Sequence, residues 1–224
     1  MAAAALLLCV SAKDALAGGP RVISTSLCAD QFVLALLEPE RIVSLSRQAT
    51  DPELSVFWRR AGGIPQNRGS VEEIVLSDAD IVISNAWGVS KTGDFLEAKG
   101  VKVVALPLLE NLEGIVALTN VIAAELQAEA RGAALVAAFE RQLAEIRASW
   151  PATRPRALYL SPGGTTAGSG SFGHRVMVEG GSLNIAADEL GKQGWSSIGL
   201  EEAVLAGPDM LVLSFFRRES WSMT

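Results

Sequence analysis

Short apolar segments and amphipathic segments alternate along the first half of the chain. The apolar segments are rich in Val and Ile and have the length of buried strands, whereas the segments between them have helical spacing. The expected strands are residues 21–26, 41–46, 80–84 and 101–106, and the expected helices are 27–37, 52–61, 70–77 and 94–99. Short apolar strands separated by helices are typical of a parallel sheet covered on both faces. The pattern therefore predicts an α/β fold.

Residues 113–149 have a longer helical pattern. Apolar residues recur every three or four positions, alanine fills much of the remainder, and no proline occurs before Pro151. Two interpretations stay open. The segment is one connecting helix of about 55 Å at ~1.5 Å per residue, or two successive helices divided near Gln127 or Gly132.

The α/β pattern then restarts with fewer elements. Strands are expected at 156–161 and 209–214, helices at 175–179 and 201–206, and a Gly/Ser/Thr loop at 162–173. Two strands are few for a sheet, so we expect an incomplete second lobe in a chain shortened at its C-terminus. The predicted organisation is a leader at 1–17, a first lobe at 18–112, a connecting helical region at 113–149 and a second lobe at 150–224.

One phrase occurs twice in the sequence. Residues 72–83 and 201–212 share five of twelve positions: the two Glu, then Val, Leu and Asp. Each copy predicts an acidic helix start, a short helix, a turn and a buried strand. The repeat indicates two similar lobes, with Glu72 and Glu201 at equivalent corners.

Composition and charge narrow the function. The chain of 224 residues has a net charge of −6 and no tract of Lys or Arg, which argues against a nucleic-acid partner. An apolar run from Ala2 to Ala12 and small residues before Ala17 predict a secretory signal peptide, although no Lys or Arg precedes the run. Its removal leaves Cys28, which we expect to be a small buried residue.

The candidate catalytic and metal chemistry is sparse. Gly168, Gly170 and Gly173 have the spacing of a dinucleotide loop, which would suit a reductase or transferase. Six residues separate Gly168 from the expected strand, so we favour a flexible loop that lines a cleft. His174 is the single histidine and Cys residues do not cluster, so we expect no metal site and no catalytic residues. We expect His174 to begin a helix.

Several side chains that suit ligand binding follow expected strands or lie in polar turns. Trp87 and Asn85 follow the third strand, Arg47 follows the second, and Trp195 lies in a Gly/Ser turn. Ligands of open α/β sheets bind beyond the carboxyl ends of strands. There a Trp can stack on a flat ligand, and an Arg can bind a carboxylate. The alternative is that each Trp closes a loop over the core.

These segments together resemble the periplasmic binding proteins that serve importers of vitamin B12, ferric siderophores and haem. The resemblance rests on residues 21–26, 70–80, the helical region, 167–170, 180–187 and 200–209. It implies two Rossmann-like lobes joined by a rigid backbone helix, with the ligand in the cleft between them. Ala79 departs from the family, which usually has Pro there, and the family's last strand and helix are missing.

The resemblance also implies a function. One Glu of each lobe, Glu72 and Glu201 here, would dock on arginines of the two subunits of an ABC permease in the inner membrane. The alternative is that these two residues only favour helix N-termini electrostatically. Trp87 and Trp195 fall close to positions where vitamin B12 binders carry cleft tryptophans, which favours cobalamin slightly over a ferric siderophore. We therefore expect a monomeric periplasmic carrier of a small metal-bearing complex, without enzymatic activity or a cofactor of its own.

Overall fold

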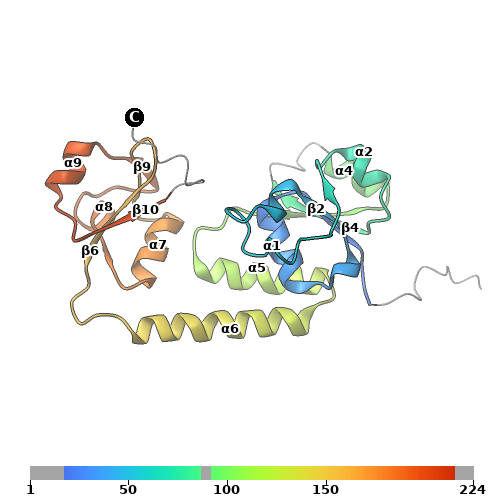
Figure 1. Ribbon diagram of the computed structural model, residues 1–224, viewed down its shortest axis with the longest axis horizontal. Helices are drawn as coiled ribbons and strands as arrows, with labels where there is room; N and C mark the ends of the chain where they lie inside the picture. The colour runs from blue at the N-terminus through green and yellow to red at the C-terminus, as the bar shows by residue number, and fades with distance from the viewer. Residues whose placement is uncertain (1–17, 87–91, 215–224) are drawn as a thin grey trace, which may run out of the picture.

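The computed structural model describes residues 18–86 and 92–214, which form two α/β lobes joined by a long helix (Figure 1). The predicted signal peptide and Trp87 lie outside the described residues.

The first lobe is built on a five-stranded parallel sheet in the order β3-β2-β1-β4-β5. Its strands are β1 (Val22–Ser24), β2 (Ile42–Ser46), β3 (Gln66–Asn67), β4 (Ile81–Asn85) and β5 (Lys102–Leu106). The four expected strands are confirmed. The sequence analysis missed β3 because its two residues are polar. Asn67 is buried and donates from Nδ2 to the Ser24 carbonyl and the Ser44 hydroxyl, so its amide joins β3 to the sheet.

Helices cover both faces of this sheet, as predicted. On one face lie α1 (Leu27–Leu36) and α5 (Leu112–Glu125), and on the other lie α2 (Val71–Val75) and α4 (Gly93–Ala98). Successive side chains of a strand point to opposite faces. Val22 and Ile83 accordingly join the core beneath α1, whereas Ile23 and Val82 join the core beneath α2 and α4.

The predicted helix at 52–61 is wrong, because the segment is a series of turns. The Asp51 carboxylate accepts a hydrogen bond from the Glu53 amide (2.9 Å), and the Trp58 amide bonds to Ser55 rather than to Leu54. Such local side-chain bonds compete with a helical ladder. Phe57 still packs on the core beneath α1, which explains the apolar positions.

The helical region divides into α5 and α6 (Glu129–Ala148), which run antiparallel to each other. The break falls at Gln127, one of the two expected places, where φ is +50°. The α5 helix packs on the first lobe beside α1, while α6 has 20 residues and runs from the first lobe to the second (Figure 1). At ~1.5 Å per residue, α6 is about 30 Å long, so the connecting helix is shorter than the single helix considered above.

The second lobe has a smaller sheet. Three parallel strands lie in the order β10-β6-β8, and a separate antiparallel pair is formed by β7 and β9. The elements are β6 (Arg156–Leu160), β7 (Thr165–Ala167), α7 (Phe172–Glu179), β8 (Leu183–Asn184), α8 (Ile185–Asp188), β9 (Trp195–Ser197), α9 (Leu200–Leu205) and β10 (Met210–Leu213). The two expected strands are confirmed as β6 and β10. The three others have two or three residues each and carry no clear periodic pattern.

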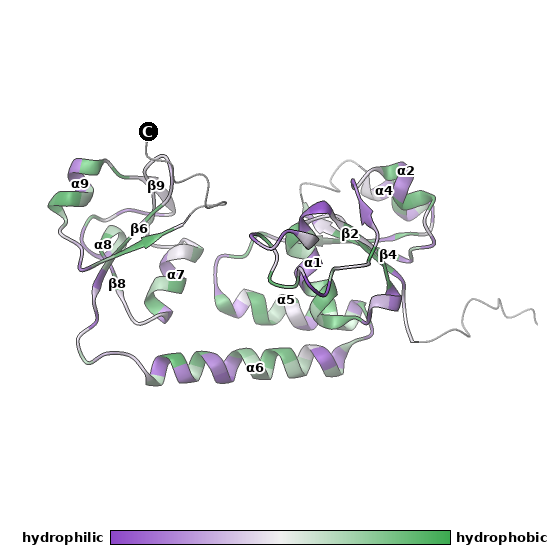
Figure 2. Ribbon diagram, in the orientation of Figure 1, coloured by the Kyte–Doolittle hydropathy of each residue, from purple (hydrophilic) through white to green (hydrophobic). Residues whose placement is uncertain are grey.

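Hydrophobic residues concentrate on the strands and on the helix faces that cover them (Figure 2). In the second lobe Leu158 of β6 packs with Ile185 and Ala203, from α8 and α9. Cys28 corrects an expectation, because it is exposed rather than buried. The buried stripe of α1 begins one position later, at Ala29, so the thiol points away from the sheet.

Candidate functional site

The repeated phrase has the same structural role in both lobes. Its aspartates, Asp80 and Asp209, each accept a hydrogen bond from a backbone amide at the start of the first strand of the lobe: Asp80 from Arg21, directly before β1 (2.8 Å), and Asp209 from Arg156, the first residue of β6 (2.9 Å). Each aspartate amide bonds back to the carbonyl of the same arginine, at 2.9 Å in both lobes. The shared aspartates therefore hold the strand at the end of each copy against the first strand of the same lobe.

The second glutamate of each copy also has an internal partner. Glu73 completes a capping box with Ser70 at the start of α2. At the equivalent position of α9, where Gly199 replaces Ser70 as the cap residue, Glu202 pairs with Lys192 at 2.9 Å. These residues stabilise the lobe to which they belong.

The first glutamate of each copy differs from the second. Glu72 and Glu201 lie in the first turns of α2 and α9, and both are exposed. The two helices lie in different lobes on the same side of the molecule, opposite α6 (Figure 1). Carboxylates at helix starts also interact favourably with the helix dipole, so both roles considered for them remain compatible with the geometry.

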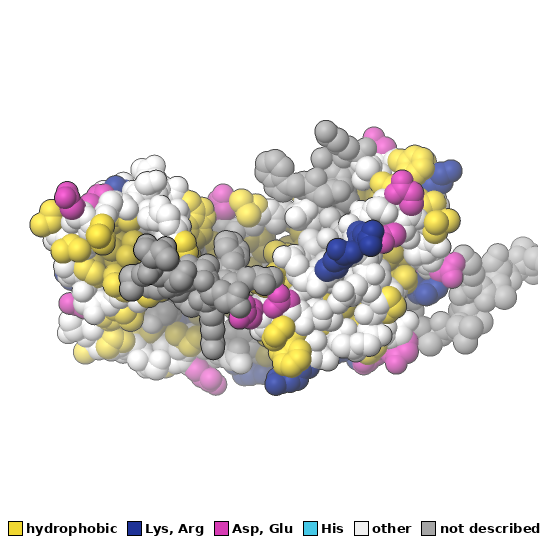
Figure 3. All heavy atoms as spheres, turned by 45° about the horizontal axis from the view of Figure 1, so that its top comes forward, with side chains coloured by type: hydrophobic (Ala, Val, Ile, Leu, Met, Phe, Trp, Pro, Cys, Tyr) yellow, Lys and Arg dark blue, Asp and Glu magenta, His cyan; other side chains and the backbone are white. Residues whose placement is uncertain are grey.

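The structure adds a pair of leucines that the sequence analysis did not single out. Leu76 and Leu205 occupy the same position of the repeated phrase, four residues after Glu72 and Glu201, and they are 86% and 87% exposed. Figure 3 shows acidic and hydrophobic side chains next to each other at the outer part of each lobe. An identical leucine that is almost fully exposed in both lobes points to a role at the surface. The identity of Leu76 and Leu205 in the two copies of the phrase is the sequence signal that could have identified this pair.

Two of the predicted ligand-binding residues lie at one edge of the first sheet. Arg47 directly follows β2 and is exposed, and Asn85 ends β4 and is also exposed. Strand β1 separates β2 from β4, so both residues lie at the carboxyl edge of three neighbouring parallel strands. Trp87, the third member of this predicted group, lies outside the described residues.

A buried carboxyl holds the end of β2 beside Arg47. Asp30 of α1 accepts hydrogen bonds from the Ser46 amide (3.0 Å) and the Ser46 hydroxyl (2.5 Å). Burial raises the pKa of Asp30, although its hydrogen bonds with Ser24 and Ser46 act in the opposite direction. The sequence analysis missed this residue, because an acidic residue near a helix start is ordinary.

Trp195, from the second lobe, is an exposed aromatic platform. It starts β9, is 56% exposed, and packs edge-to-face against Tyr159 with ring centroids 5.4 Å apart. A Cβ on Gly173 would lie 3.0 Å from Cη2 of the Trp195 ring, so the glycine lets the start of α7 approach it. One part of the Trp195 side chain thus packs within the second lobe, and the rest is exposed to solvent.

The glycine loop at residues 168–173 makes backbone contacts within the second lobe that the sequence did not predict. Strand β7 ends directly before Gly168, which corrects the expected gap of six residues. The Gly168 amide donates to the Gly194 carbonyl (2.7 Å) and the Ser169 amide to the Lys192 carbonyl (2.9 Å). A Cβ on Gly168 would lie 2.4 Å from the Lys192 carbonyl. The loop therefore packs on residues 192–194 with amides that a pyrophosphate would need.

His174 lies in the first turn of α7, as expected, and its Nδ1 is 3.0 Å from Nδ2 of the Asn184 side chain. Among residues 18–86 and 92–214, no group of three His, Cys, Asp or Glu side chains is placed to hold a metal ion. Within the same ranges, no helix combines the length and the apolar character needed to cross a membrane.

A chain of ion pairs connects the two lobes and α6. Arg175 of α7 pairs with Glu113 of α5 in the first lobe (2.6 Å) and with Glu179 (3.4 Å), and Glu179 pairs with Arg147 of α6 (2.7 Å). The hydrogen bond from Arg147 holds the pKa of Glu179 below its ordinary value. The backbone amide of Glu113, and then Arg175, lower the pKa of Glu113.

Comparisons with known proteins agree with this architecture. A family model described as periplasmic binding protein matches residues 22–216. No curated protein sequence matches. The solved structures that resemble the chain include three periplasmic ligand-binding proteins. Two are haem-binding proteins: that of Vibrio cholerae has a TM-score of 0.76 and 17% identity, covering 91% of this chain and 79% of its own. The haem-binding protein of Roseiflexus has a TM-score of 0.69 and 24% identity, and the match covers 88% of this chain and 76% of that protein.

The third, the vitamin B12-binding protein of Vibrio cholerae, has a TM-score of 0.65 and 19% identity, covering 92% of this chain and 80% of its own. Identities this low support the fold, and the family model extends over nearly all the described residues. The two α/β lobes and the connecting helix agree with both. The chain therefore belongs to the periplasmic binding protein family, in its two-lobed form with a helical backbone.

Proposed function

We propose that this protein is the substrate-binding component of an ABC importer. It captures a metal-bearing organic complex between its lobes and delivers it to a permease dimer in the inner membrane. The ligand class is cobalamin, a ferric siderophore or haem, and the metal arrives as part of the cargo. The protein works as a monomer in the periplasm after removal of residues 1–17, and it catalyses no reaction.

The observation that carries this proposal is the matched pair of surface corners. Each lobe presents an exposed glutamate and, four residues later, a leucine that is almost fully exposed. A partner with two equivalent subunits needs two equivalent contacts, and cationic side chains on each subunit complement the carboxylates. Because the second glutamates and the aspartates of the phrase have internal partners, Glu72, Glu201, Leu76 and Leu205 are the matched residues that we assign to an external one.

The ligand proposal is supported by the exposed ring of Trp195 in one lobe and by Arg47 and Asn85 at the strand ends of the other. An aromatic platform suits a flat macrocycle, and a guanidinium suits a carboxylate at its rim. The structural neighbours that bind haem and vitamin B12 support the same class of ligand.

A titration of the intact chain tests the ligand class. Tryptophan fluorescence is followed during addition of haemin, cyanocobalamin, a ferric hydroxamate, NADH and ATP in separate experiments. We expect saturable quenching by one metal complex and none by the nucleotides. Saturable binding of NADH or ATP, with no response to the complexes, would instead favour the nucleotide-dependent reductase or transferase.

Charge reversal tests the docking surface independently of ligand binding. The double variant Glu72→Lys/Glu201→Lys replaces the native gene in the host, and uptake of the ligand found by titration is measured. We expect unchanged ligand affinity and a loss of uptake of about tenfold or more, because like charges then face the permease. Glu140→Lys, an exposed glutamate of α6 on the opposite side, is the matched control. Normal uptake by the double variant would refute docking through these residues.

A further inference from the structure

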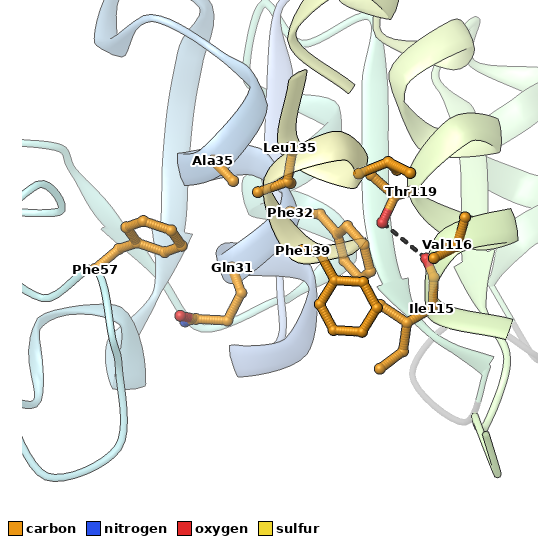
Figure 4. A pocket seen from close by; sticks show the side chains of 10 residues that line it. Gln31, Phe32, Ala35, Phe57, Ile115, Val116, Thr119, Leu135 and Phe139 are labelled. Atoms are coloured by element: carbon orange, nitrogen blue, oxygen red, sulfur yellow. Dashed lines mark hydrogen bonds between the residues drawn. The ribbon is translucent and has the colours of Figure 1, made fainter. Parts of the chain in front are cut away.

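A pocket of about 200 Å³ lies in the first lobe, where α6 passes over α1 and α5 (Figure 4). Ten residues line it, among them Phe32 of α1, Ile115 of α5 and Phe139 of α6, and none of the ten is charged. The charged groups that could select a ligand lie elsewhere in this lobe, at the carboxyl edge of its sheet.

Two exposed arginines lie at neighbouring strand ends of the first sheet. Strands β2 and β3 are parallel, and their last registered pair is Ser46 and Asn67. Arg47 and Arg68 follow directly and so occupy the next position in the same register, at the carboxyl ends of the two strands. Because neighbouring strands are about 4.8 Å apart, the two side chains start from adjacent points of the backbone. This is the edge at which open α/β sheets bind ligands.

The backbone at Arg47 is fixed by its neighbours. The buried Asp30 accepts hydrogen bonds from the amide and the hydroxyl of Ser46. The same hydroxyl accepts a hydrogen bond from the Gln48 amide (3.3 Å) and so caps the short helical turn of residues 47–50. The residues on both sides of Arg47 are therefore held in place, while Arg47 itself stays exposed.

Arg68 is placed in a similar way. The buried side chain of Asn67, which joins β3 to the sheet, also accepts a hydrogen bond from the Gly69 amide (2.9 Å). The Arg68 amide donates to the Glu73 carboxylate in the first turn of α2 (2.8 Å), and Arg68 remains exposed. Both arginines thus extend from a fixed backbone, which lowers the entropic cost of binding a ligand through them.

Neither arginine side chain has a partner in the described part of the chain. Within residues 18–86 and 92–214, the arginines without a side-chain hydrogen bond, ion pair or ring contact are Arg47, Arg68 and Arg141, and Arg141 is an exposed residue of α6. Like charges on neighbouring strands disfavour folding, although a chain with a net charge of −6 has many carboxylates that could have paired with them. An anion from outside the chain would offset this repulsion.

We propose that Arg47 and Arg68 form a clamp for two carboxylates at one rim of the cargo. An arginine fork matches a carboxylate through two parallel hydrogen bonds, and two adjacent forks match two carboxylates. The clamp rests on the proposed function and narrows it, because the cargo is then haem, held by its two propionates, or the ferric complex of a carboxylate siderophore. Cobalamin and ferric hydroxamates have no free carboxylate and would leave both arginines unpaired.

Matched probes test the clamp. Haemin dimethyl ester, in which both propionates are blocked, is compared with haemin, and ferric citrate represents the carboxylate siderophores. Tryptophan fluorescence measures the binding of each to the intact chain, beside cyanocobalamin and a ferric hydroxamate. We expect haemin or ferric citrate to bind, and a haem carrier to bind haemin about tenfold or more tightly than the diester, because charge-assisted hydrogen bonds are the strong ones. The preferred complex identifies the source of the carboxylates.

Arginine variants separate the clamp from a structural role. Arg47→Gln/Arg68→Gln should lower the affinity for the carboxylate complex by about tenfold or more and leave the affinity for the diester unchanged. Its urea midpoint should equal or exceed that of the parent, because two like charges are removed. Arg141→Gln, which removes an unpartnered arginine from α6, is the matched control and should bind as the parent does.

Several outcomes would overturn the clamp but not the carrier. They are binding of cyanocobalamin or the ferric hydroxamate alone, equal affinity for haemin and its diester without binding of ferric citrate, and unchanged affinity for the carboxylate complex in the double variant. A urea midpoint well below that of the parent would likewise assign the arginines to the fold. If none of the complexes binds to the parent, the proposed function fails, and the clamp fails with it.

Discussion

Trp195 shows at the scale of a single residue how packing can hold an aromatic ring in a fixed position at the surface. The edge of its ring is fixed against Tyr159, and Gly173 leaves room for it at the start of α7. A ring that is held in place but still 56% exposed loses little freedom when a flat ligand stacks on it.

We expect Trp195→Ala to weaken ligand binding by ~1–3 kcal/mol, the range found for aromatic stacking on nucleobases. Trp195→Phe keeps a ring at the same position and should retain most of the affinity. The measurement is a calorimetric titration with the complex identified by fluorescence. Equal affinity in the parent and in Trp195→Ala would remove the residue from the site.

The aspartates of the repeated phrase and its first glutamates differ in their hydrogen-bond partners. Asp80 and Asp209 hold backbone amides, and their identity in the two copies has a structural cause. Glu72 and Glu201 have no such cause in the structure beyond their place at a helix start. The same sequence signal thus marks residues of two kinds, and only their hydrogen-bond partners separate them.

At the scale of elements, the crossing of α5 and α6 depends on Gly132. We expect Gly132→Ala to lower the free energy of unfolding by about 1–2 kcal/mol. The added methyl would overlap Ala123, and overpacking costs ~1–3 kcal/mol, which exceeds the helix-propensity gain of about 1 kcal/mol. Urea unfolding measures the difference. Gly93→Ala, where the nearest atom lies 4.0 Å from the new Cβ, is the matched control. Equal losses in both variants would contradict a specific close contact.

The ion pair between Arg147 of α6 and Glu179 of α7 should contribute to the free energy of unfolding in a pH-dependent way. The pKa of Glu179 is lower in the folded chain than its ordinary value of 4.5, chiefly through the hydrogen bond from Arg147. An acid with a lowered pKa contributes stability above its unfolded pKa, and that contribution disappears as the pH falls through the folded pKa. The parent should therefore be more stable than Glu179→Gln at pH 7, and the difference should shrink well below pH 4.5.

Urea unfolding of both proteins at a series of pH values measures this difference. Glu140→Gln, at an exposed position of α6, serves as the control and should show little pH-dependent difference. A constant gap between the parent and Glu179→Gln across the series would show that the ion pair is not its source.

At the scale of the whole molecule, two of the connections between the described lobes bear on their spacing. One is covalent, through α6, and the other is the ion pair between Glu113 and Arg175. Both side chains of this pair are more than one third exposed, so its strength should fall with added salt.

We expect Arg175→Gln to broaden the distribution of distances between the lobes. The exposed Cys28 carries one spin label and Val204→Cys carries the other, in a background with Cys9→Ser, and electron–electron double resonance measures the distances. High salt should broaden the parent distribution in the same way. A single narrow distance under all conditions would show that α6 alone fixes the lobes.

The sequence analysis predicted most of the first lobe, because its strands are continuous apolar runs and its helices have amphipathic spacing. It was wrong at 52–61, where Asp51 and Ser55 form turns. It also missed β7 and β9, because strands of three residues acquire their structure only from each other. Of the candidate site, it singled out Glu72, Glu201 and Trp195, which the structure shows to be exposed and whose roles stay predictions. It could not anticipate Asp30 or the ion pairs, whose partners lie far away in the chain.

The sequence by itself determined the α/β class, the duplication of the lobes and the positions of Glu72 and Glu201, since each depends on local patterns or on self-similarity. Only the tertiary structure decided that the chain turns back at Gln127, that Leu76 and Leu205 stay uncovered, and that α6 leaves a pocket against the first lobe. The physical reason is that these features depend on how surfaces from distant segments fit together. Periodicity states which face of a helix is apolar, but not how completely a neighbour covers it.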